Sequence, residues 1–489
     1  MKNYLIIIMI LLFCSGINGQ NKEEKLYKEK YRPQFHFSPK KGWIGDPCGF
    51  IYYQGKYQMF WWGKVVSDDL VHYKEVSEKI MKGEPRKISY FTGSMLVDED
   101  NTSGFGKNTM VANYTIFDHE TKNQSQGMSF SHDGETFQYY NGNPVIDIGS
   151  TEFRDPTVVW HEPTKRWIMV VALALEKKIR FYSSPDLKNW TWMSDFGPLG
   201  DNERAWECPD LFQLSVGGNP DNKKWVMVVS INWAREQYFI GDFDGNSFKL
   251  MDGHPEQPLY VDYGMDYYAS RVFQDYDRKL ENVTTMGWVA YWDYAPKVPS
   301  TWGKGFWSIP RNLELKTYPE GIRMIQTPHE NLKSLRKDTF SYKGKTKQGT
   351  SILPNFSPKE NVYEMEIALS TDIPNIFGLN LCVGEGRKVV FRYDTQSETL
   401  LIDRTNCSDV PIDKFSRISF AKVSAVDNKI KLHFFVDQSS IELFTNDGKE
   451  VFTLLTYPSD SQTGIEIFAL NKGSEINYTA WTLNSIWNK

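Results

Sequence analysis

Three acidic residues lie at equivalent points of a pattern that repeats along the sequence. Asp46 and Asp155 each stand directly before a proline, and Glu207 stands two residues before one. Each acid precedes the aromatic residue of a repeated strand-like run, by 11, 12 and 18 residues respectively. Carboxyl groups that are brought together can divide the work of glycoside hydrolysis, because one attacks or stabilises the anomeric carbon and another protonates the leaving oxygen. Crowding of like charges raises the pKa of one member and keeps it protonated near neutral pH.

Other chemistries for these acids have less support in the sequence. Taken singly, an Asp-Pro step is usually a turn or a strand start, so the evidence is the shared place of the acids in the repeat. Arg154 precedes Asp155 and is expected to keep that acid ionised. Three carboxylates could instead bind Ca²⁺, but no Asp-x-Asp-x-Asp loop lies nearby. A Ser-His-Asp triad is unsupported, because the 8 His are scattered and no Gly-x-Ser-x-Gly elbow occurs.

The elements that must position these acids follow from two repeated templates. The first contains a central aspartate that is followed by Leu or Gly and then by an aromatic residue. Its copies centre on Asp69, Asp133, Asp186 and, more weakly, Asp244, which are 64, 53 and 58 residues apart. The second is a run with a basic residue, an aromatic residue and a Met, found at Lys56–Phe60, Arg166–Val170 and Lys224–Val228. Such a period, with several strands per unit, is typical of β-propeller blades, and the three acids would then converge at one mouth of the central channel.

The C-terminal region has a different pattern. Val362–Ile367 and Lys429–Val436 alternate between apolar and polar residues, which indicates half-buried antiparallel strands. We therefore predict an all-β protein, with a propeller at residues 31–335 and a β-sandwich at residues 350–489. The lysine-rich segment from Leu332 to Gly349 is expected to connect the two domains.

Composition and the N-terminus indicate an exported protein. The chain has 489 residues, of which 15% are aromatic, and this aromatic content favours sheets. Its net charge of −5 argues against a nucleic-acid partner. Residues 1–19 resemble a signal peptide, with Lys2 before the apolar run Tyr4–Phe13, which is too short to span a membrane. Cys14 offers a second interpretation, lipid attachment at the cell surface; otherwise the protein is expected to be periplasmic or extracellular.

Four cysteines follow the predicted signal peptide, without a CxxC pair or zinc spacing. Cys382 and Cys407 lie in the same C-terminal region and could form a disulfide in an oxidising compartment. The alternative is that they are small buried thiols.

Longer motifs run from about Arg32 to the C-terminus. They resemble those of glycoside hydrolase family 32, which comprises invertases, inulinases, levanases and related β-fructosidases. The matching stretches are Gln34–Pro39, Trp43–Gly49, Phe91–Ser94, Asn101–Phe105, Phe153–Pro156, Trp206–Phe212, Tyr263–Ala269, Gly287–Trp288 through Pro310–Arg311, and Val436–Glu442. The resemblance implies a five-bladed propeller with an appended sandwich, and a retaining mechanism that needs no cofactor and no metal.

The resemblance also implies roles for individual residues. Asp46 would be the nucleophile and Glu207 the acid/base, while Asp155 would hold sugar hydroxyls and stabilise the transition state. Retention requires a gap of about 5–5.5 Å between nucleophile and acid. The residues that it places at the sugar pocket are Trp43, Phe91, Thr92, Arg154, Asp266, Tyr268 and Trp292.

The sequence departs from the family pattern beside the nucleophile. The family usually has Asn before this Asp and Asn after the following Pro, where this chain has Gly45 and Cys48. The usual Gln-Tyr-Asn-Pro run and a longer Trp-bearing loop are also missing. In the family these side chains help to hold the terminal fructose. Trp61, Trp62 or Lys64 is therefore expected to fill the vacated space.

The leading prediction is a secreted hydrolase of β-fructosidase type that acts on a fructan, sucrose or a fructose-containing oligosaccharide. Its partner would be an oligo- or polysaccharide. One alternative is a carbohydrate-binding protein with lost activity. Others are a hydrolase of another furanoside such as arabinan, and a fructosyltransferase, which would share the covalent intermediate.

Overall fold

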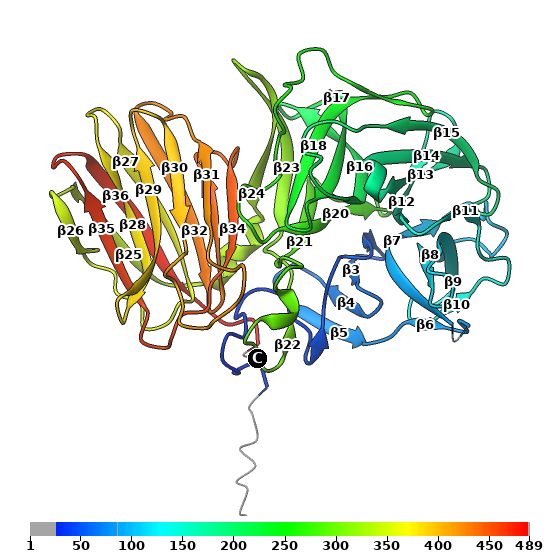
Figure 1. The fold of residues 1–489 in the computed structure, drawn as a ribbon, viewed down its shortest axis with the longest axis horizontal. Coiled ribbons are helices and arrows are strands. Elements are labelled where there is room, and N and C mark those ends of the chain that lie inside the picture. Colours follow the sequence, from blue (N-terminus) through cyan, green and yellow to red (C-terminus); the bar gives the residue numbers. More distant parts are fainter. Residues whose placement is uncertain (1–25, 86, 488–489) are drawn as a thin grey trace, which may run out of the picture.

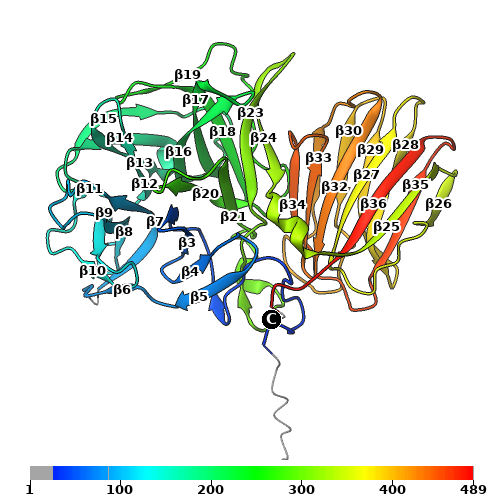
Figure 2. The same ribbon diagram turned by 180° about the vertical axis from the view of Figure 1, so that it is seen from behind.

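The structure, a computed structural model, describes residues 26–85 and 87–487. The predicted signal peptide and Cys14 lie outside the described residues. Two all-β bodies stand side by side, a propeller and a sandwich (Figure 1). The view from behind shows the propeller strands arranged around a centre and the sandwich strands in layers (Figure 2). Within the described part of the chain, no helix is long and apolar enough to cross a membrane.

The propeller consists of five four-stranded antiparallel units, which we call blades 1 to 5. Blades 1 and 2 contain, in order from the centre, β2 (Phe50–Tyr53), β3 (Lys56–Phe60), β4 (Lys64–Ser67) and β5 (Tyr73–Ser77), and β7 (Ile88–Asp98), β8 (Thr109–Asp118), β9 (Gln124–Ser131) and β10 (Phe137–Tyr139). Blades 3 and 4 contain β12 (Phe153–His161), β13 (Arg166–Leu173), β14 (Lys178–Ser184) and β15 (Thr191–Phe196), and β16 (Trp206–Val216), β17 (Asn219–Ile231), β18 (Arg235–Phe243) and β19 (Phe248–Leu250). Blade 5 contains β20 (Tyr268–Asp275), β21 (Val283–Trp288), β23 (Arg311–Tyr318) and β24 (Gly321–Pro328). The innermost strands of the last and first blades, β20 and β2, pair in parallel.

Short additional strands complete the propeller. They are β1 (Gly42–Trp43), which pairs with β22 (Gly303–Lys304), β6 (Met81–Lys82), which pairs with β10, and β11 (Ile146–Ser150), which pairs with β9. The β1–β22 pair ties the segment before blade 1 to blade 5.

The repeated aspartates form the turns between the third and fourth strands of blades 1 to 4. Asp69, Asp133, Asp186 and Asp244 each accept hydrogen bonds from the backbone N–H groups two and three residues ahead, at 2.7–3.0 Å. An aspartate side chain that binds its own backbone in this way favours a tight turn. The first sequence template is therefore the local signal for the outer turn of a blade.

The sandwich has two six-stranded sheets around one apolar core. One sheet contains β25 (Arg336–Lys345), β36 (Glu475–Leu483), β27 (Tyr363–Ser370), β32 (Lys429–Asp437), β33 (Ser440–Thr445) and β34 (Val451–Leu455). The other contains β26 (Gly349–Ile352), β35 (Gly464–Ala469), β28 (Ile376–Gly384), β29 (Arg387–Asp394), β30 (Thr399–Asp403) and β31 (Ile418–Lys422).

The lysine-rich segment is not the connector that we expected. It contains the end of the 3₁₀ helix η3 (Glu330–Leu335), all of β25 and the start of β26. Strand β25 pairs with β36 from Thr339 to Lys345. Since β25 lies at the edge of its sheet, alternate side chains face water, and this exposure explains the polar, lysine-rich sequence. The first sandwich strand therefore begins at Arg336, directly after η3.

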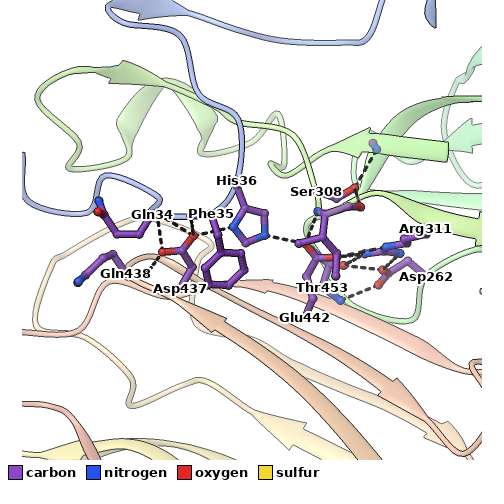
Figure 3. A network of polar contacts seen from close by, with 12 residues as sticks. Gln34, Phe35, His36, Asp262, Ser308, Arg311, Asp437, Gln438, Glu442 and Thr453 are labelled. Atoms are coloured by element: carbon purple, nitrogen blue, oxygen red, sulfur yellow. Dashed lines mark hydrogen bonds and ion pairs between the residues drawn. The ribbon is translucent and has the colours of Figure 1, made fainter. Parts of the chain in front are cut away.

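A buried polar network joins the two domains (Figure 3). His36 lies between two carboxylates of the sandwich, with Nδ1 2.7 Å from Asp437 and Nε2 2.8 Å from Glu442. Arg311 of β23 binds Glu442 and also Asp262, with Nη1 3.0 Å from the latter. Such a network is favourable only when its members are hydrogen-bonded, and here each charged group faces a partner of opposite sign.

The four cysteines of the described chain, Cys48, Cys208, Cys382 and Cys407, are buried free thiols. Cys382 and Cys407 both belong to the sandwich core. The structure therefore favours the buried-thiol interpretation of this pair over the disulfide.

Candidate active site

The structure brings the three repeated acids together at one end of the propeller axis. Asp46 lies between β1 and β2, Asp155 is the third residue of β12, and Glu207 is the second residue of β16. The Cys208 sulfur lies 3.8 Å from Asp46 Oδ2 and 3.5 Å from Asp155 Oδ2, and Cys208 directly follows Glu207. The repeat phase therefore predicted the convergence correctly.

A β-bulge occurs at the same level in four innermost strands. The pairing register shifts between Tyr90 and Gly93 in β7, Arg154 and Thr157 in β12, Glu207 and Asp210 in β16, and Tyr268 and Arg271 in β20. In the last three strands the bulge contains a left-handed residue, with φ of 66° at Asp155, 47° at Cys208 and 53° at Ala269. Bulges redirect side chains and often lie beside active sites.

These bulges place Arg154, Glu207 and Tyr268 at equivalent positions of neighbouring blades, each directly before a left-handed residue. Arg154 Nε donates to Glu207 Oε1 at 2.9 Å, and the Tyr268 hydroxyl donates to Glu207 Oε2. Glu207 is therefore held from both sides by side chains that the same backbone geometry directs. Glu152 also binds Arg154, at 2.6 Å from Nη1.

The electrostatic environment of the acids differs from the expected one. Burial, and next the charge of Asp155, raises the pKa of Asp46 to about 7, although a 2.8 Å hydrogen bond from Thr92 opposes the shift. Burial and the charge of Glu207 raise the pKa of Asp155 to about 6. Arg154 lowers the pKa of Asp155 without overcoming burial, because its guanidinium is directed to Glu207 and Glu152 instead. The expectation that Arg154 keeps Asp155 ionised is therefore not supported.

Comparison with known proteins identifies the family. Residues 36–328 match the model of the glycosyl hydrolases family 32 N-terminal domain, and residues 331–482 match that of the family 32 C-terminal domain. The chain belongs to glycosyl hydrolase family 32. It is therefore a glycosidase, and its propeller and sandwich are the two domains of this family.

Several relatives of family 32 are similar over most of their length. A levanase of Bacillus subtilis is 38% identical over 100% of this chain and 76% of its own length. An invertase of Schizosaccharomyces pombe is 30% identical, over 97% of this chain and 89% of its own length. The crystal structure of an exo-inulinase from Aspergillus awamori has a TM-score of 0.87 at 28% identity and covers 94% of this chain and 100% of its own.

The sugar-pocket residues expected from the family differ in how far they are exposed and in which residues they contact. Thr92 is buried and contacts Asp46, and Phe91 is half-buried and stacks on Phe117 at 4.8 Å. Trp43 and Trp292 are exposed by 39% and 38%, and their rings stack at 5.7 Å. Tyr268 is fully buried and reaches Glu207 only through its hydroxyl.

Asp266 was wrongly predicted as a pocket residue. Its side chain is fully buried, and Oδ2 forms an ion pair with Arg404 of the sandwich and accepts from the Leu455 N–H at 2.8 Å. Oδ1 accepts from the Tyr294 hydroxyl. These contacts occupy both carboxylate oxygens, so Asp266 is a domain-interface residue.

The site also shows how this chain departs from the family pattern. A Cβ atom on Gly45 would lie 2.9 Å from Trp43 Nε1, so the Trp43 indole occupies the space beside Gly45, the residue before Asp46. Lys64 does not fill the vacated pocket, because its buried ammonium donates to the Gly134 carbonyl at 2.8 Å. Trp61 packs on Trp307, and Trp62 is half-buried with its ring 5.6 Å from Tyr114.

Arg271 of β20 is a functional candidate that the sequence analysis missed. It is 2% exposed, and Nη1 donates to the carbonyls of Cys208 and Pro209 at 2.8 and 3.0 Å. Its charge lowers the pKa values of Asp46 and Asp155. Within the described residues, Nε and Nη2 have no hydrogen-bond partner. The available sequence signal was an arginine beside the apolar residues Val272 and Phe273 of an innermost strand.

Three carboxylates close together could in principle form a Ca²⁺ site. Among the described residues, the side chains whose ligand atoms all lie within 4.8 Å of one another are instead Glu364, Glu366 and His433 of the sandwich. Arg336 already forms ion pairs with both glutamates. The single positive charge of Arg336 therefore offsets part of the negative charge of these two glutamates.

Proposed function

We propose that this chain is a retaining β-fructosidase that hydrolyses fructosyl bonds of fructans, fructo-oligosaccharides or sucrose. The observation that carries the proposal is the convergence of Asp46, Asp155 and Glu207 at one mouth of the propeller in a member of family 32. Its relatives include a levanase, an exo-inulinase and a β-fructofuranosidase complexed with fructosyl-erythritol, and their substrates or ligand all present a fructosyl unit.

In this mechanism Asp46 attacks the anomeric carbon and forms a covalent fructosyl ester, while Glu207 protonates the departing oxygen. Glu207 then takes a proton from water, which attacks the ester and releases fructose. Asp46 must be ionised to attack, and the neighbouring Arg271 and the Thr92 hydroxyl favour that form. Arg154 and Tyr268 fix the carboxyl of Glu207 in one orientation.

Asp155 would bind sugar hydroxyls. Its Oδ2 accepts from the Cys208 N–H at 3.1 Å, which fixes the carboxyl beside Asp46. A fixed carboxylate that binds hydroxyls more strongly as positive charge develops on the sugar stabilises the transition state.

We also infer that the protein is exported. The support is the signal-like sequence of residues 1–19 and the extracellular nature of the fungal exo-inulinases that it resembles. Detection of the mature N-terminus in the cell envelope or medium, with cleavage after Gly19, is the expected result; an uncleaved cytoplasmic chain would contradict the inference.

The experiment that tests the function is reducing-sugar release from sucrose, inulin, levan and arabinan by the purified mature chain. We expect fructose or fructo-oligosaccharides from the fructosyl substrates and none from the Asp46→Asn variant. Release from arabinan alone would retain the mechanism and change the sugar. Release from none of these substrates would contradict the proposal, and transfer products at high sugar concentration would indicate a fructosyltransferase.

A further inference from the structure

The hairpin beside Glu207 displays an exposed tryptophan. Glu207 pairs with Ser230, and Trp206 pairs with Ile231, so the turn between β17 and β18 begins beside Trp206, the residue before Glu207. Asn232 and Trp233 form this turn with left-handed φ values of 57° and 63°. The Trp233 side chain is 36% exposed.

Polar contacts hold the backbone of this turn. The Asn232 amide accepts from the Arg204 N–H at 2.9 Å and donates to Asp201 at 2.8 Å. The Arg204 guanidinium lies 5.0 Å from the centre of the Trp233 ring. Arg204 itself stands three residues before Glu207, on the segment that enters β16.

Trp233 is joined to the aromatic pair on the nucleophile side of the mouth. The Trp292 N–H donates to the Trp233 carbonyl at 3.3 Å, and the Trp292 ring stacks on Trp43, which lies three residues before Asp46. We call Trp43, Trp292 and Trp233, with Arg204, the tryptophan ledge. Its members reach from the segment that carries Asp46 to the strand pair that carries Glu207.

Single exposed tryptophans are common on proteins and need no function. In the described chain, however, four tryptophans are exposed, and three of them form this ledge. The fourth, Trp192, lies on β15, the outermost strand of blade 3. Exposure concentrated at the mouth of an active site indicates a binding surface.

The chemistry of the reaction indicates what this surface binds. The acid/base protonates the oxygen of the leaving group, so the leaving sugar must lie on the Glu207 side of the bond that is cleaved. Indole faces pack against the C–H faces of sugar rings, and a guanidinium donates hydrogen bonds to hydroxyls. We propose that Trp233 and Arg204 form a subsite for the leaving chain of an oligo- or polysaccharide, beyond the sugar next to the cleaved bond.

This inference rests on the proposed function, because it uses Glu207 as the acid. The test compares kcat/KM for sucrose, whose leaving group is one sugar, with kcat/KM for a fructan pentasaccharide. In Trp233→Ala we expect the ratio of pentasaccharide to sucrose to fall about 3- to 10-fold, as expected for loss of one aromatic contact. Arg204→Gln should shift the ratio in the same direction, and Trp233→Phe should restore most of it.

Trp192→Ala is the matched control. Trp192 is 56% exposed and also has an arginine near its ring, Arg180 at 6.0 Å, but it lies away from the mouth. We expect its ratio to equal that of the wild type. An unchanged ratio in Trp233→Ala, with sucrose cleaved normally, would overturn the subsite and leave the proposed function intact.

Failure of the proposed function is a separate outcome. If the wild-type chain cleaves neither sucrose nor the pentasaccharide, the ledge is tested by calorimetric titration of the wild type with the pentasaccharide. Binding that Trp233→Ala weakens and Trp192→Ala does not would support the subsite. Absence of binding, or equal binding by both variants, would overturn it.

Discussion

Arg154 of blade 3 and Tyr268 of blade 5 bind the carboxylate of Glu207, which lies on blade 4 between them. They can do so because each lies at the equivalent β-bulge of its innermost strand. Arg154 binds one oxygen of Glu207 and Tyr268 binds the other. The repeat of the propeller therefore supplies both the acid and the two groups that orient it. This arrangement makes Glu207 dependent on its neighbours for its orientation.

Removal of the Tyr268 hydroxyl should slow catalysis without unfolding the protein. In Tyr268→Phe, Glu207 loses one of its two fixing hydrogen bonds, and we expect kcat for sucrose to fall about 10- to 100-fold with a smaller change in KM. The matched control is Tyr267→Phe. Tyr267 is the buried neighbour whose hydroxyl has no partner in the described chain, and its loss should leave kcat within about twofold. Equal effects of the two substitutions would contradict the role of Tyr268.

Asp46→Asn should abolish activity and stabilise the fold at neutral and higher pH. The pKa of Asp46 is raised from 3.8 to about 7, so the folded state resists its ionisation and loses stability as the pH rises from about 4 to about 7. The amide cannot ionise and therefore avoids this cost. We therefore expect a higher Tm than the wild type at pH 8 and an equal Tm at pH 4 in buffered thermal melts. Asp68→Asn, on an exposed turn, should change neither, and a destabilised Asp46→Asn variant at pH 8 would contradict the argument.

The domain interface should weaken at alkaline pH. Hydrogen bonds and charges from Asp437 and Glu442 outweigh burial and raise the pKa of His36 from 6.5 to about 9. A raised histidine pKa stabilises the folded state fully below about pH 6.5, and this contribution is lost as the pH rises through about 9. Wild-type stability should therefore decline between these values, and His36→Asn should be less stable at pH 6 and have a flatter profile. His132→Asn, at an exposed site, should retain the wild-type profile; an unchanged slope in His36→Asn would refute the assignment.

Asp266 should affect stability more than substrate binding. Because Asp266 forms a buried ion pair with Arg404, Asp266→Asn should leave that guanidinium under-compensated and lower the free energy of unfolding by about 3–5 kcal/mol. Denaturant unfolding measures this change. At a temperature where the variant is folded, KM for sucrose should stay within about twofold of the wild type. The control is Asp413→Asn, which removes one member of an exposed ion pair with Lys297 and should not change the free energy of unfolding. A large rise in KM for Asp266→Asn without loss of stability would contradict the assignment of Asp266 to the domain interface.

The fold could be predicted from local patterns because propeller blades repeat local structure. The central aspartates mark turns that their own side chains form, and the Met-containing runs are second strands of blades 1, 3 and 4. The lysine-rich segment was predicted to be a linker because an edge strand with one solvent-exposed face, here β25, has a similar polar composition. Asp266 was misplaced because a motif match does not reveal whether a carboxylate faces a pocket or an arginine from another domain.

The sequence by itself determined the repeat, the phase of Asp46, Asp155 and Glu207 within it, and thus their meeting at one mouth. These properties depend on the spacing of the blades along the sequence and on the residues that form their turns, and both can be read from short segments. Only the tertiary structure decided that Arg154 binds Glu207 rather than protecting Asp155, that Arg271 binds the Cys208 carbonyl, and that the turn with Trp233 follows the strand paired with Glu207. Such relationships join residues tens to hundreds of positions apart, and they depend on the bulges, burial and blade closure that bring those residues within a few ångströms.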